Sequence, residues 1–302
     1  MSAPAQFPPF ATAPASESAS ASPVGSPASA PKIVIAGAGP AAQALVRQLA
    51  TARFRGTVTV LSSRDDAPDE LLELAALPFV SVRFGQPASH IDAAARVVTT
   101  ADGMDFGYDQ LVIATGSTPA HSLVEGSSRC LSYSTIDDAA KIGDAVKVVT
   151  RVLGRRPLGI LVGTGAAAGQ AEAVLRARGV RPVRTTARPA AVVPSPAGSV
   201  LPAAGIVFDD GSRMNGDLVV LAEDRIARDR LAASAGVQTA ASGGVAVGRD
   251  FRSSVPGIWA IGDAASFDGV RLGLLVASDS AAGVCAAELM TAVPDVRLAA
   301  AA

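Results

Sequence analysis

Cysteine is almost absent from this 302-residue chain: only Cys130 and Cys285 occur, and no C-x-x-C pair exists. The chain therefore lacks both a thiol-relay motif and the ligand spacing of a zinc site, and we assign it no metal. Two isolated cysteines suit a reducing compartment. We expect a cytoplasmic protein in which both cysteines are small buried residues.

The chain also lacks a charge excess and a long hydrophobic run. Its formal net charge is −1, so no basic surplus indicates nucleic acid or an anionic membrane as a partner. No stretch reaches the about 18 uninterrupted apolar residues of a membrane-spanning helix. Residues 1–31 are rich in Ala, Ser and Pro and contain no Lys or Arg, which excludes a typical signal peptide and predicts a disordered leader. Residues 293–302 are expected to be a tail.

What the chain has is a strand, a glycine turn and a helix in direct succession from Lys32 onwards. Apolar residues 33–36 run into the sequence GAGPAA (37–42), and an amphipathic segment follows without a polar loop. This is the order of a dinucleotide-binding unit. Gly37 permits the tight turn, Gly39 leaves the backbone open to a pyrophosphate, and Ala42 lets the helix lie close to the strand. The N–H groups of the first helical turn would meet the phosphates.

The next strand, expected at 57–61, ends in a way that leaves the ribose contact open. Dinucleotide-binding units commonly carry Asp or Glu at this point, to bind the ribose hydroxyls. Here Ser62 and Ser63 follow, with Asp65 shortly after them. Either a serine hydroxyl or Asp65 substitutes for the missing carboxylate, or the ribose contact is weak.

A second unit of the same design follows, because residues 159–162 enter the sequence GTG (163–165) and a helical segment comes next. Two units imply two bound dinucleotides, or one functional site and one that has lost its ligand. The following strand, expected over Val183–Thr186, ends without a carboxylate, whereas Arg184 and Arg188 lie close by. Arginine there suits a 2′-phosphate and favours NADPH over NADH; the alternative is that both are solvated surface residues.

Two further strand ends carry small or acidic residues. One strand ends in Ala114-Thr115-Gly116, followed by Ser117-Thr118-Pro119, and another ends in Gly262-Asp263. An aspartate at the carboxyl end of a strand points into the crevice where open α/β sheets bind ligands. Trp259, in the second of these strands, is expected to lie in the core.

Other local signals concern helices and histidines. Ser134 or Thr135 is predicted to cap a helix whose first turn contains two aspartates. A later helix is expected over Leu275–Met290. His90 is placed in a polar turn and His121 after Pro119; both are expected to be solvated, so we assign no catalytic acid or base.

The blocks GAGPAA (37–42), ATGSTP (114–119), GTGAAAG (163–169) and IWAIGDAA (258–265) stand in a fixed order. Together they resemble the pyridine nucleotide–disulfide oxidoreductase superfamily of FAD-dependent reductases, over roughly Lys32 to Met290. Flanking phrases, CLSYSTIDDAAKI before the second glycine turn among them, are most similar to the reductase module of the NAD(P)H nitrite reductase large subunit. They are equally similar to the assimilatory nitrate reductase electron-transfer subunit.

The resemblance implies an α/β fold of two nested Rossmann-like, three-layer domains without a C-terminal dimerisation domain. The FAD-binding domain would comprise residues 32–120 and 245–292, and a shortened NAD(P)H-binding domain residues 121–244. It also implies cofactor-binding residues. Those for FAD are Gly37, Gly39, Pro40, Ala42, Ser62, Ala114, Thr115, Gly116, Gly262 and Asp263, and those for NAD(P)H are Gly163, Gly165 and Ala168. Asp263 would bind the ribityl chain.

Several departures from the family pattern keep a second hypothesis open. Gln170 stands where most relatives have a carboxylate, and a glycine-proline turn expected near Glu223–Arg228 is absent. Between Leu61 and Val82, the segment that in relatives lies against the flavin ring is deleted. The first hypothesis is an NAD(P)H oxidoreductase that passes electrons through FAD to a redox partner protein, possibly a nitrite or nitrate reductase component. The second is an FAD- or nucleotide-binding scaffold or regulator without turnover. The oligomeric state stays open.

Overall fold

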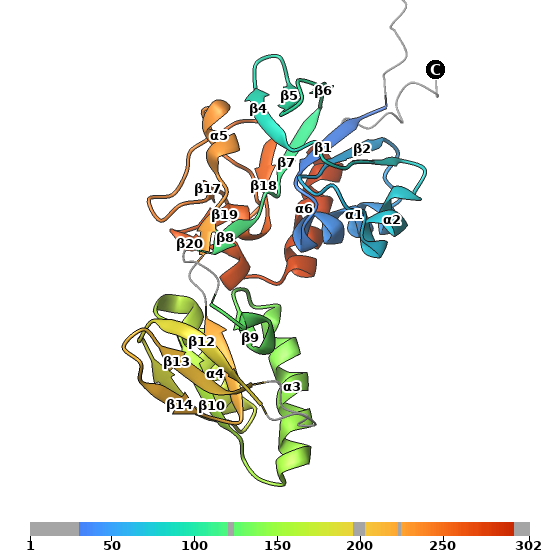
Figure 1. The fold of residues 1–302 in the computed structure, drawn as a ribbon. Helices are drawn as coiled ribbons and strands as arrows, with labels where there is room; N and C mark the ends of the chain where they lie inside the picture. The colour runs from blue at the N-terminus through green and yellow to red at the C-terminus, as the bar shows by residue number, and fades with distance from the viewer. Residues whose placement is uncertain (1–29, 120–123, 196–202, 223–224, 293–302) are drawn as a thin grey trace, which may run out of the picture.

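The computed structural model describes residues 30–119, 124–195, 203–222 and 225–292, which form two lobes (Figure 1). The first lobe is made of the chain up to β8 (Ser117–Pro119) and of the chain from β16 (Arg225–Ala227) onwards. The second lobe is the part in between. β8 and β16 pair antiparallel beside the junction, so the outgoing and returning chain segments support each other.

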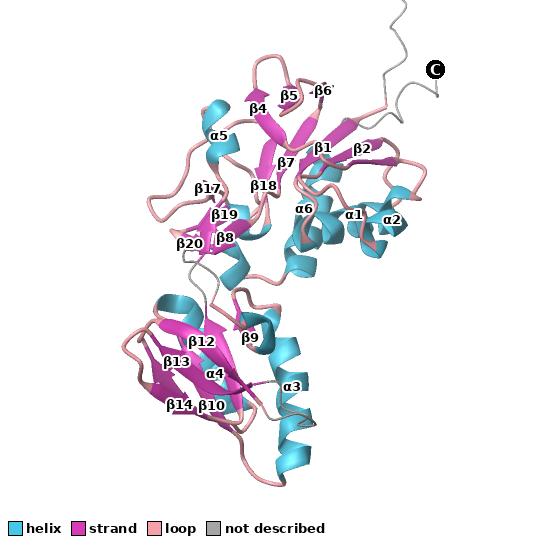
Figure 2. Ribbon diagram, in the orientation of Figure 1, coloured by secondary structure: helices cyan, strands magenta, loops and turns pink. Residues whose placement is uncertain are grey.

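A five-stranded parallel sheet in the order β18-β7-β1-β2-β3 forms the centre of the first lobe. Its strands are Ile258–Ala260 (β18), Gln110–Ile113 (β7), Lys32–Ala36 (β1), Thr57–Leu61 (β2) and Val80–Arg83 (β3). Helices α1 (Pro40–Thr51), α2 (Asp69–Ala75) and α6 (Ser278–Ala292) pack beside it (Figure 2). The central strands are buried along nearly their whole length, as expected for a covered parallel sheet.

Smaller elements complete the first lobe. An antiparallel sheet consists of β4 (Ala88–Asp92), β5 (Val97–Thr100) and β6 (Asp105–Gly107), and α5 (Arg230–Ser234) packs on β4. A second small sheet consists of β17 (Val245–Ala246), β19 (Ala265–Phe267) and β20 (Val270–Arg271). Two short 3₁₀ helices, η2 (Gly262–Ala264) and η3 (Leu272–Leu274), flank this sheet in sequence.

The second lobe repeats the design on a smaller scale. Its parallel sheet has the order β11-β10-β15-β9, with strands Arg181–Thr185 (β11), Leu158–Val162 (β10), Leu218–Ala222 (β15) and Leu131–Tyr133 (β9). Helices α3 (Asp138–Leu153) and α4 (Gly165–Ala177) pack against it. The antiparallel strands Pro189–Pro194 (β12), Ala203–Phe208 (β13) and Arg213–Asn215 (β14), preceded by the 3₁₀ turn Ser127–Arg129 (η1), form a further layer.

These two lobes confirm the predicted fold class, since each contains a parallel sheet in which a strand runs through a glycine turn into a helix. Trp259 is 1% exposed, and its indole Nε1 donates to Gln110 Oε1 at 2.8 Å, which confirms its place in the core. Within the described residues, no helix is long and apolar enough to cross a membrane.

Three local predictions are wrong. His90 lies in strand β4, where it faces Thr99 of β5, and not in a turn. Ser134 and Thr135 are not helix caps, because α3 begins only at Asp138 and the Asp138 carboxylate instead accepts their backbone N–H groups. The last helix begins at Ser278, three residues later than expected, because a non-helical turn over 275–277 separates it from η3. His121 lies outside the described residues.

Candidate functional site

The first glycine turn is locked between two neighbouring strands of the first lobe. Gly37 has φ +118°, and a Cβ atom there would overlap the carbonyl oxygen of Ala114 at the end of β7. Its N–H donates to the carbonyl of Leu61 at the end of β2, at 2.8 Å. A side chain at residue 37 would therefore separate the strands, which explains physically why glycine stands here.

Gly39 plays a different part in the same turn. It is the N-cap of α1 with φ −75°, a conformation open to any residue, and an added Cβ would meet no atom within 4 Å. Pro40 occupies the first helical position, and no side chain caps the helix. The first N–H groups of α1 therefore face open space beside Gly39, which is the arrangement that binds an anion. Ala42, 1% exposed, packs the helix onto the sheet.

A cavity of about 460 Å³ opens at this edge of the sheet. We call it the glycine-turn cavity. Ala36 and Gly37 form its wall at the turn, Ser63 borders it after β2, and Thr115 borders it after β7. Residues 226–231, where the chain has returned from the second lobe, also line the cavity. Its size is within the usual range of small-molecule and cofactor sites.

The structure separates the three candidates for the ribose contact. Ser62 is fully buried and its hydroxyl oxygen accepts the N–H of Arg64 at 3.1 Å, whereas Ser63 lines the glycine-turn cavity. The carboxylate of Asp65 lies against Gly85, where an added Cβ would come within 2.7 Å of Oδ1. Of the three side chains, only that of Ser63 belongs to a residue bordering the cavity.

Asp263 lies at the carboxyl edge of β18, next to the start of α1. Gly262 makes this possible, since it has φ +64° and an added Cβ would come within 2.7 Å of the Ala41 methyl group. Asp263 is nearly buried, with a side chain 12% exposed. This places Gly262 and Asp263 beside the first glycine turn.

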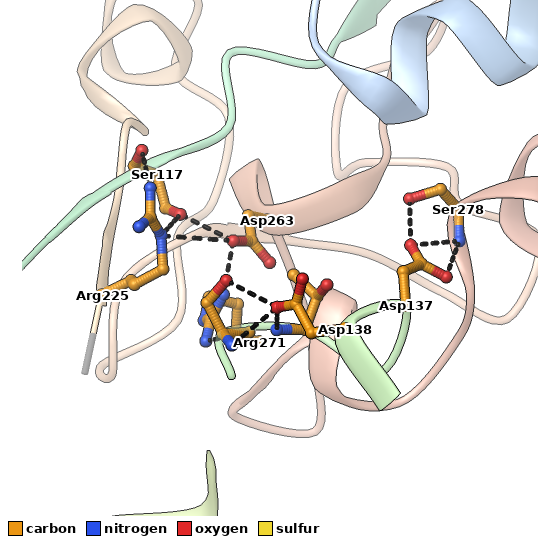
Figure 3. A network of polar contacts seen from close by, with 9 residues as sticks. Ser117, Asp137, Asp138, Arg225, Asp263, Arg271 and Ser278 are labelled. Atoms are coloured by element: carbon orange, nitrogen blue, oxygen red, sulfur yellow. Dashed lines mark hydrogen bonds and ion pairs between the residues drawn. The ribbon is translucent and has the colours of Figure 1, made fainter. Parts of the chain in front are cut away.

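Two arginines that the sequence motifs do not include surround Asp263 (Figure 3). Asp263 Oδ2 forms an ion pair with Arg271 Nη1, accepts the Ser117 hydroxyl at 2.6 Å and lies 3.8 Å from Arg225 Nε. Arg225 also donates to the Ser117 hydroxyl at 2.7 Å. The other oxygen, Oδ1, is buried beside Gly273 and has no hydrogen-bond partner among the described residues.

The same network reaches the second lobe. Arg271 Nη2 donates to the carbonyl of Ser134 at 2.6 Å, and the Asp138 carboxylate accepts the N–H of Ser134 at 2.8 Å (Figure 3). Asp137 accepts both the N–H and the hydroxyl of Ser278, at 3.1 and 2.7 Å, and so caps α6 from the other lobe. Residue types alone could not reveal the Arg271–Ser134 and Asp137–Ser278 contacts, since these partners lie more than 130 residues apart.

The second glycine turn repeats the geometry of the first. Gly163 has φ +149°, and a Cβ atom there would overlap the carbonyl of Ala222 at the end of β15. Gly165, at φ +65°, begins α4, and Ala168 is fully buried against the sheet. Arg184 lies beside this turn, with Nε 3.3 Å from the Gly163 carbonyl and Nη1 3.6 Å from Glu172.

Gln170 connects the second glycine unit to the first lobe. Its Nε2 donates to the carbonyl of Leu274 at 2.9 Å, and its Oε1 accepts the Tyr133 hydroxyl at 3.2 Å. Burial, with a smaller contribution from the Asp138 charge, raises the pKa of Tyr133, so the phenol stays protonated and remains a donor at neutral pH. The Gln170 side chain therefore has one hydrogen-bond partner in each lobe, Leu274 in the first and Tyr133 in the second.

Residues 31–168 and 161–282 match the family model described as pyridine nucleotide-disulphide oxidoreductase. The nitrite reductase (NADH) large subunit of Escherichia coli (strain K12) is 27% identical over 224 residues, which are 65% of this chain and 26% of that protein. The assimilatory nitrate reductase electron transfer subunit of Bacillus subtilis (strain 168) is 26% identical over 65% of this chain and 28% of that protein. The chain thus spans about a quarter of the length of these relatives.

A third relative matches over most of its length. The rubredoxin-NAD(+) reductase of Pseudomonas putida is 26% identical over 296 residues, 81% of this chain and 74% of that protein. Among solved structures, the putidaredoxin reductase–putidaredoxin complex matches 88% of this chain and 76% of that chain, with a TM-score of 0.55 and 20% identity. At this identity the structural likeness supports the fold.

Proposed function

The chain belongs to the pyridine nucleotide-disulphide oxidoreductase family, and from that premise we propose that it is an FAD-dependent NAD(P)H oxidoreductase. In this proposal FAD binds with its diphosphate at the first glycine turn, and the nicotinamide nucleotide binds at the second. The observation that carries the proposal is the glycine-turn cavity of about 460 Å³, which opens where the diphosphate would lie.

The residues at the first turn fit the diphosphate and ribityl parts of FAD. The space beside Gly39 and the uncapped start of α1 suit a diphosphate, which the helix dipole would also stabilise. The buried Asp263 Oδ1 has no donor among the described residues, so a ligand hydroxyl group would satisfy it. Ser63 is the serine at the cavity and is proposed to bind the adenosine ribose.

FAD, when bound, supplies the redox chemistry by accepting hydride from a nicotinamide and passing electrons on. The chain's own residues position and shield it. Thr115 Oγ1 donates to the Arg228 carbonyl at 2.6 Å and fixes the returning segment across the cavity. Ser117 and Arg271 both bind Asp263 Oδ2. These two contacts fix the carboxylate and therefore also the direction of its second oxygen, Oδ1. No side chain is assigned as a proton donor or acceptor.

We propose NADPH as the preferred nucleotide because Arg184 lies beside the second glycine turn. Its guanidinium would pair with a 2′-phosphate, which NADH does not have. We expect Arg184→Gln to raise the KM for NADPH about tenfold and to change the KM for NADH less than twofold. Arg213→Gln, an exposed position on β14, is the control. Equal effects of R184Q on both nucleotides would contradict the preference.

The proposed electron acceptor is a separate redox protein, with a nitrite or nitrate reductase component as the first candidate. The relatives from E. coli and B. subtilis support this choice by their names. The whole chain contains two cysteines, too few for a four-cysteine iron–sulfur ligand set. We therefore place the terminal reduction on another polypeptide or domain.

Anaerobic reduction tests the proposal directly. The purified chain, reconstituted with FAD, should show the yellow flavin absorption, and this absorption should bleach within seconds of adding NADPH or NADH. Ferricyanide, added afterwards, should restore the colour. Protein that binds no FAD would overturn the proposal.

A second candidate function is supported by two sets of contacts, one around Asp263 and one around Gln170. Arg271, Arg225 and Ser117 engage one oxygen of Asp263, and Gln170 is hydrogen-bonded to both Leu274 and Tyr133. These contacts favour an FAD- or nucleotide-binding protein without turnover, acting as a scaffold or regulator. Yellow protein that NADPH and NADH both fail to bleach would support this function over the first.

A further inference from the structure

We propose that Arg228 and Arg230 bind the phosphates of the ligand in the glycine-turn cavity, and so make the site selective for phosphorylated ligands. Both residues line the cavity, and both are exposed. Neither guanidinium has a hydrogen bond or ion pair with any residue that the structure describes. By contrast, Arg155, Arg252 and Arg271 are paired with carboxylates.

The backbone holds these two arginines at the cavity. The N–H of Arg228 donates to the Gly116 carbonyl at 2.9 Å, and its own carbonyl accepts the Thr115 hydroxyl at 2.6 Å. The preceding residues pair with β8, and Arg230 begins α5. The segment is therefore fixed at both ends, in the lining of the same cavity as Gly37.

Asp229, between the two arginines, also lines the cavity and offsets one of their two positive charges. Asp229 directs Oδ2 to the N–H of Gly244, at 2.8 Å. Gly244 has φ +89°, which a side chain would disfavour, so this contact depends on a glycine. All three residues line the cavity, so the segment brings two arginines and one aspartate to it, and the aspartate carboxylate already accepts the Gly244 N–H.

Guanidinium groups recognise phosphate through paired, charge-assisted hydrogen bonds. Gly37 lines the cavity, and the uncapped start of α1, which follows three residues later, offers backbone N–H groups that form an anion site of modest strength. Arg228 and Arg230 add two positive charges to the cavity lining, of which Asp229 offsets one. A diphosphate in the cavity would be bound by both sets of groups, whereas the same ligand without phosphate would leave the guanidinium groups without a partner.

This inference rests on the proposed function, in which FAD is the ligand, and its experiment separates the two. We would measure the Kd of FAD by quenching of flavin fluorescence, and the Kd values of ADP and adenosine by calorimetry. The proteins are the full chain, R228Q, R230Q, the double variant, R228K, and R249Q as a control at an exposed position outside the cavity. Thermal melting checks that each variant folds.

We expect each glutamine substitution to raise the Kd of FAD and of ADP about tenfold, and to change the Kd of adenosine less than twofold. R228K should recover part of the loss, because it keeps the charge without the paired geometry. The inference is overturned if both variants bind FAD and ADP as the full chain does, or if adenosine weakens equally. Failure of the unsubstituted chain to bind FAD would instead overturn the proposed function.

Discussion

Gly37 and Gly39 lie two residues apart and are expected to respond oppositely to the same change. Gly37→Ala places a methyl group onto the Ala114 carbonyl at φ +118°, so it should cost about 2–5 kcal/mol of unfolding free energy. Gly39→Ala meets no atom within 4 Å and should change stability by less than about 0.5 kcal/mol. Because the methyl group of Gly39→Ala enters the proposed diphosphate space, this variant should still bind FAD about tenfold more weakly.

Urea unfolding and FAD titration together check this pair. The decisive protein is Gly39→Ala, since its fold is preserved and a loss of FAD affinity then reports on the ligand space alone. Unchanged FAD affinity in that variant would mean that the diphosphate lies elsewhere.

The two cysteine thiols are expected to be unreactive. Burial raises the pKa of Cys130 to about 11, and burial together with the Glu288 charge raises that of Cys285 to about 12. Since the thiolate is the nucleophile, iodoacetamide at pH 8 should label Cys130 roughly 10- to 100-fold more slowly than free cysteine, and Cys285 more slowly still. Mass spectrometry after timed labelling measures this. In concentrated guanidinium both should react at the free rate; rapid labelling of the folded protein would contradict the expectation.

Between neighbouring strands of the second lobe, Asp217 is the residue whose charge stabilises the fold. It accepts both Nη groups of Arg155 at 2.8 Å and the N–H of Leu158 at 2.7 Å. Arg155 holds the pKa of Asp217 below its usual value, with a further contribution from Leu158. A carboxyl group with a lowered folded pKa stabilises the fold above its unfolded pKa of about 3.9, and this stability is lost as the pH falls through the folded pKa.

We therefore expect Asp217→Asn to lower the unfolding free energy by about 1 kcal/mol at pH 7, and the difference from the parent to shrink below pH 4. Urea unfolding at pH 7, 5 and 3.5 measures this. Asp66→Asn is the control, since Asp66 pairs with Arg64 at the exposed surface and should have a smaller effect at every pH. A pH-independent loss in Asp217→Asn would point to packing instead of charge.

Local patterns predict the elements of this chain well, because strand, glycine turn and helix are each specified by neighbouring residues. The two glycine turns and the sheet around each could be placed from the sequence. The capping prediction for Ser134 failed because the Asp138 side chain reaches back to its N–H and displaces the start of the helix. Arg271 could not be connected with Asp263, and Arg228 could not be placed at the cavity, since both depend on how distant segments meet.

The two lobes are held together where the candidate site lies, so the proposed cofactor binding and the lobe contact would share the same residues. Arg271 bonds Asp263 on one side and the Ser134 carbonyl on the other. Leu274, from the first lobe, packs in the core of the second lobe with Ala167 and Ala171. A ligand that orders Asp263 would therefore also order the junction between the lobes. Substitutions at the junction should in turn change the local stability of α6.

Asp137 offers the clearest test of this coupling, because it caps α6 from the opposite lobe. Asp137→Ala removes acceptors from the N–H and hydroxyl of Ser278, and should cost about 1 kcal/mol and about 2 °C in Tm. Hydrogen exchange should accelerate in the first turn of α6 while the amides of α1 stay protected. Asp144→Ala, an exposed aspartate on α3, is the matched control and should leave α6 unchanged. If exchange in α6 is the same in both variants, the cap does not join the lobes in solution.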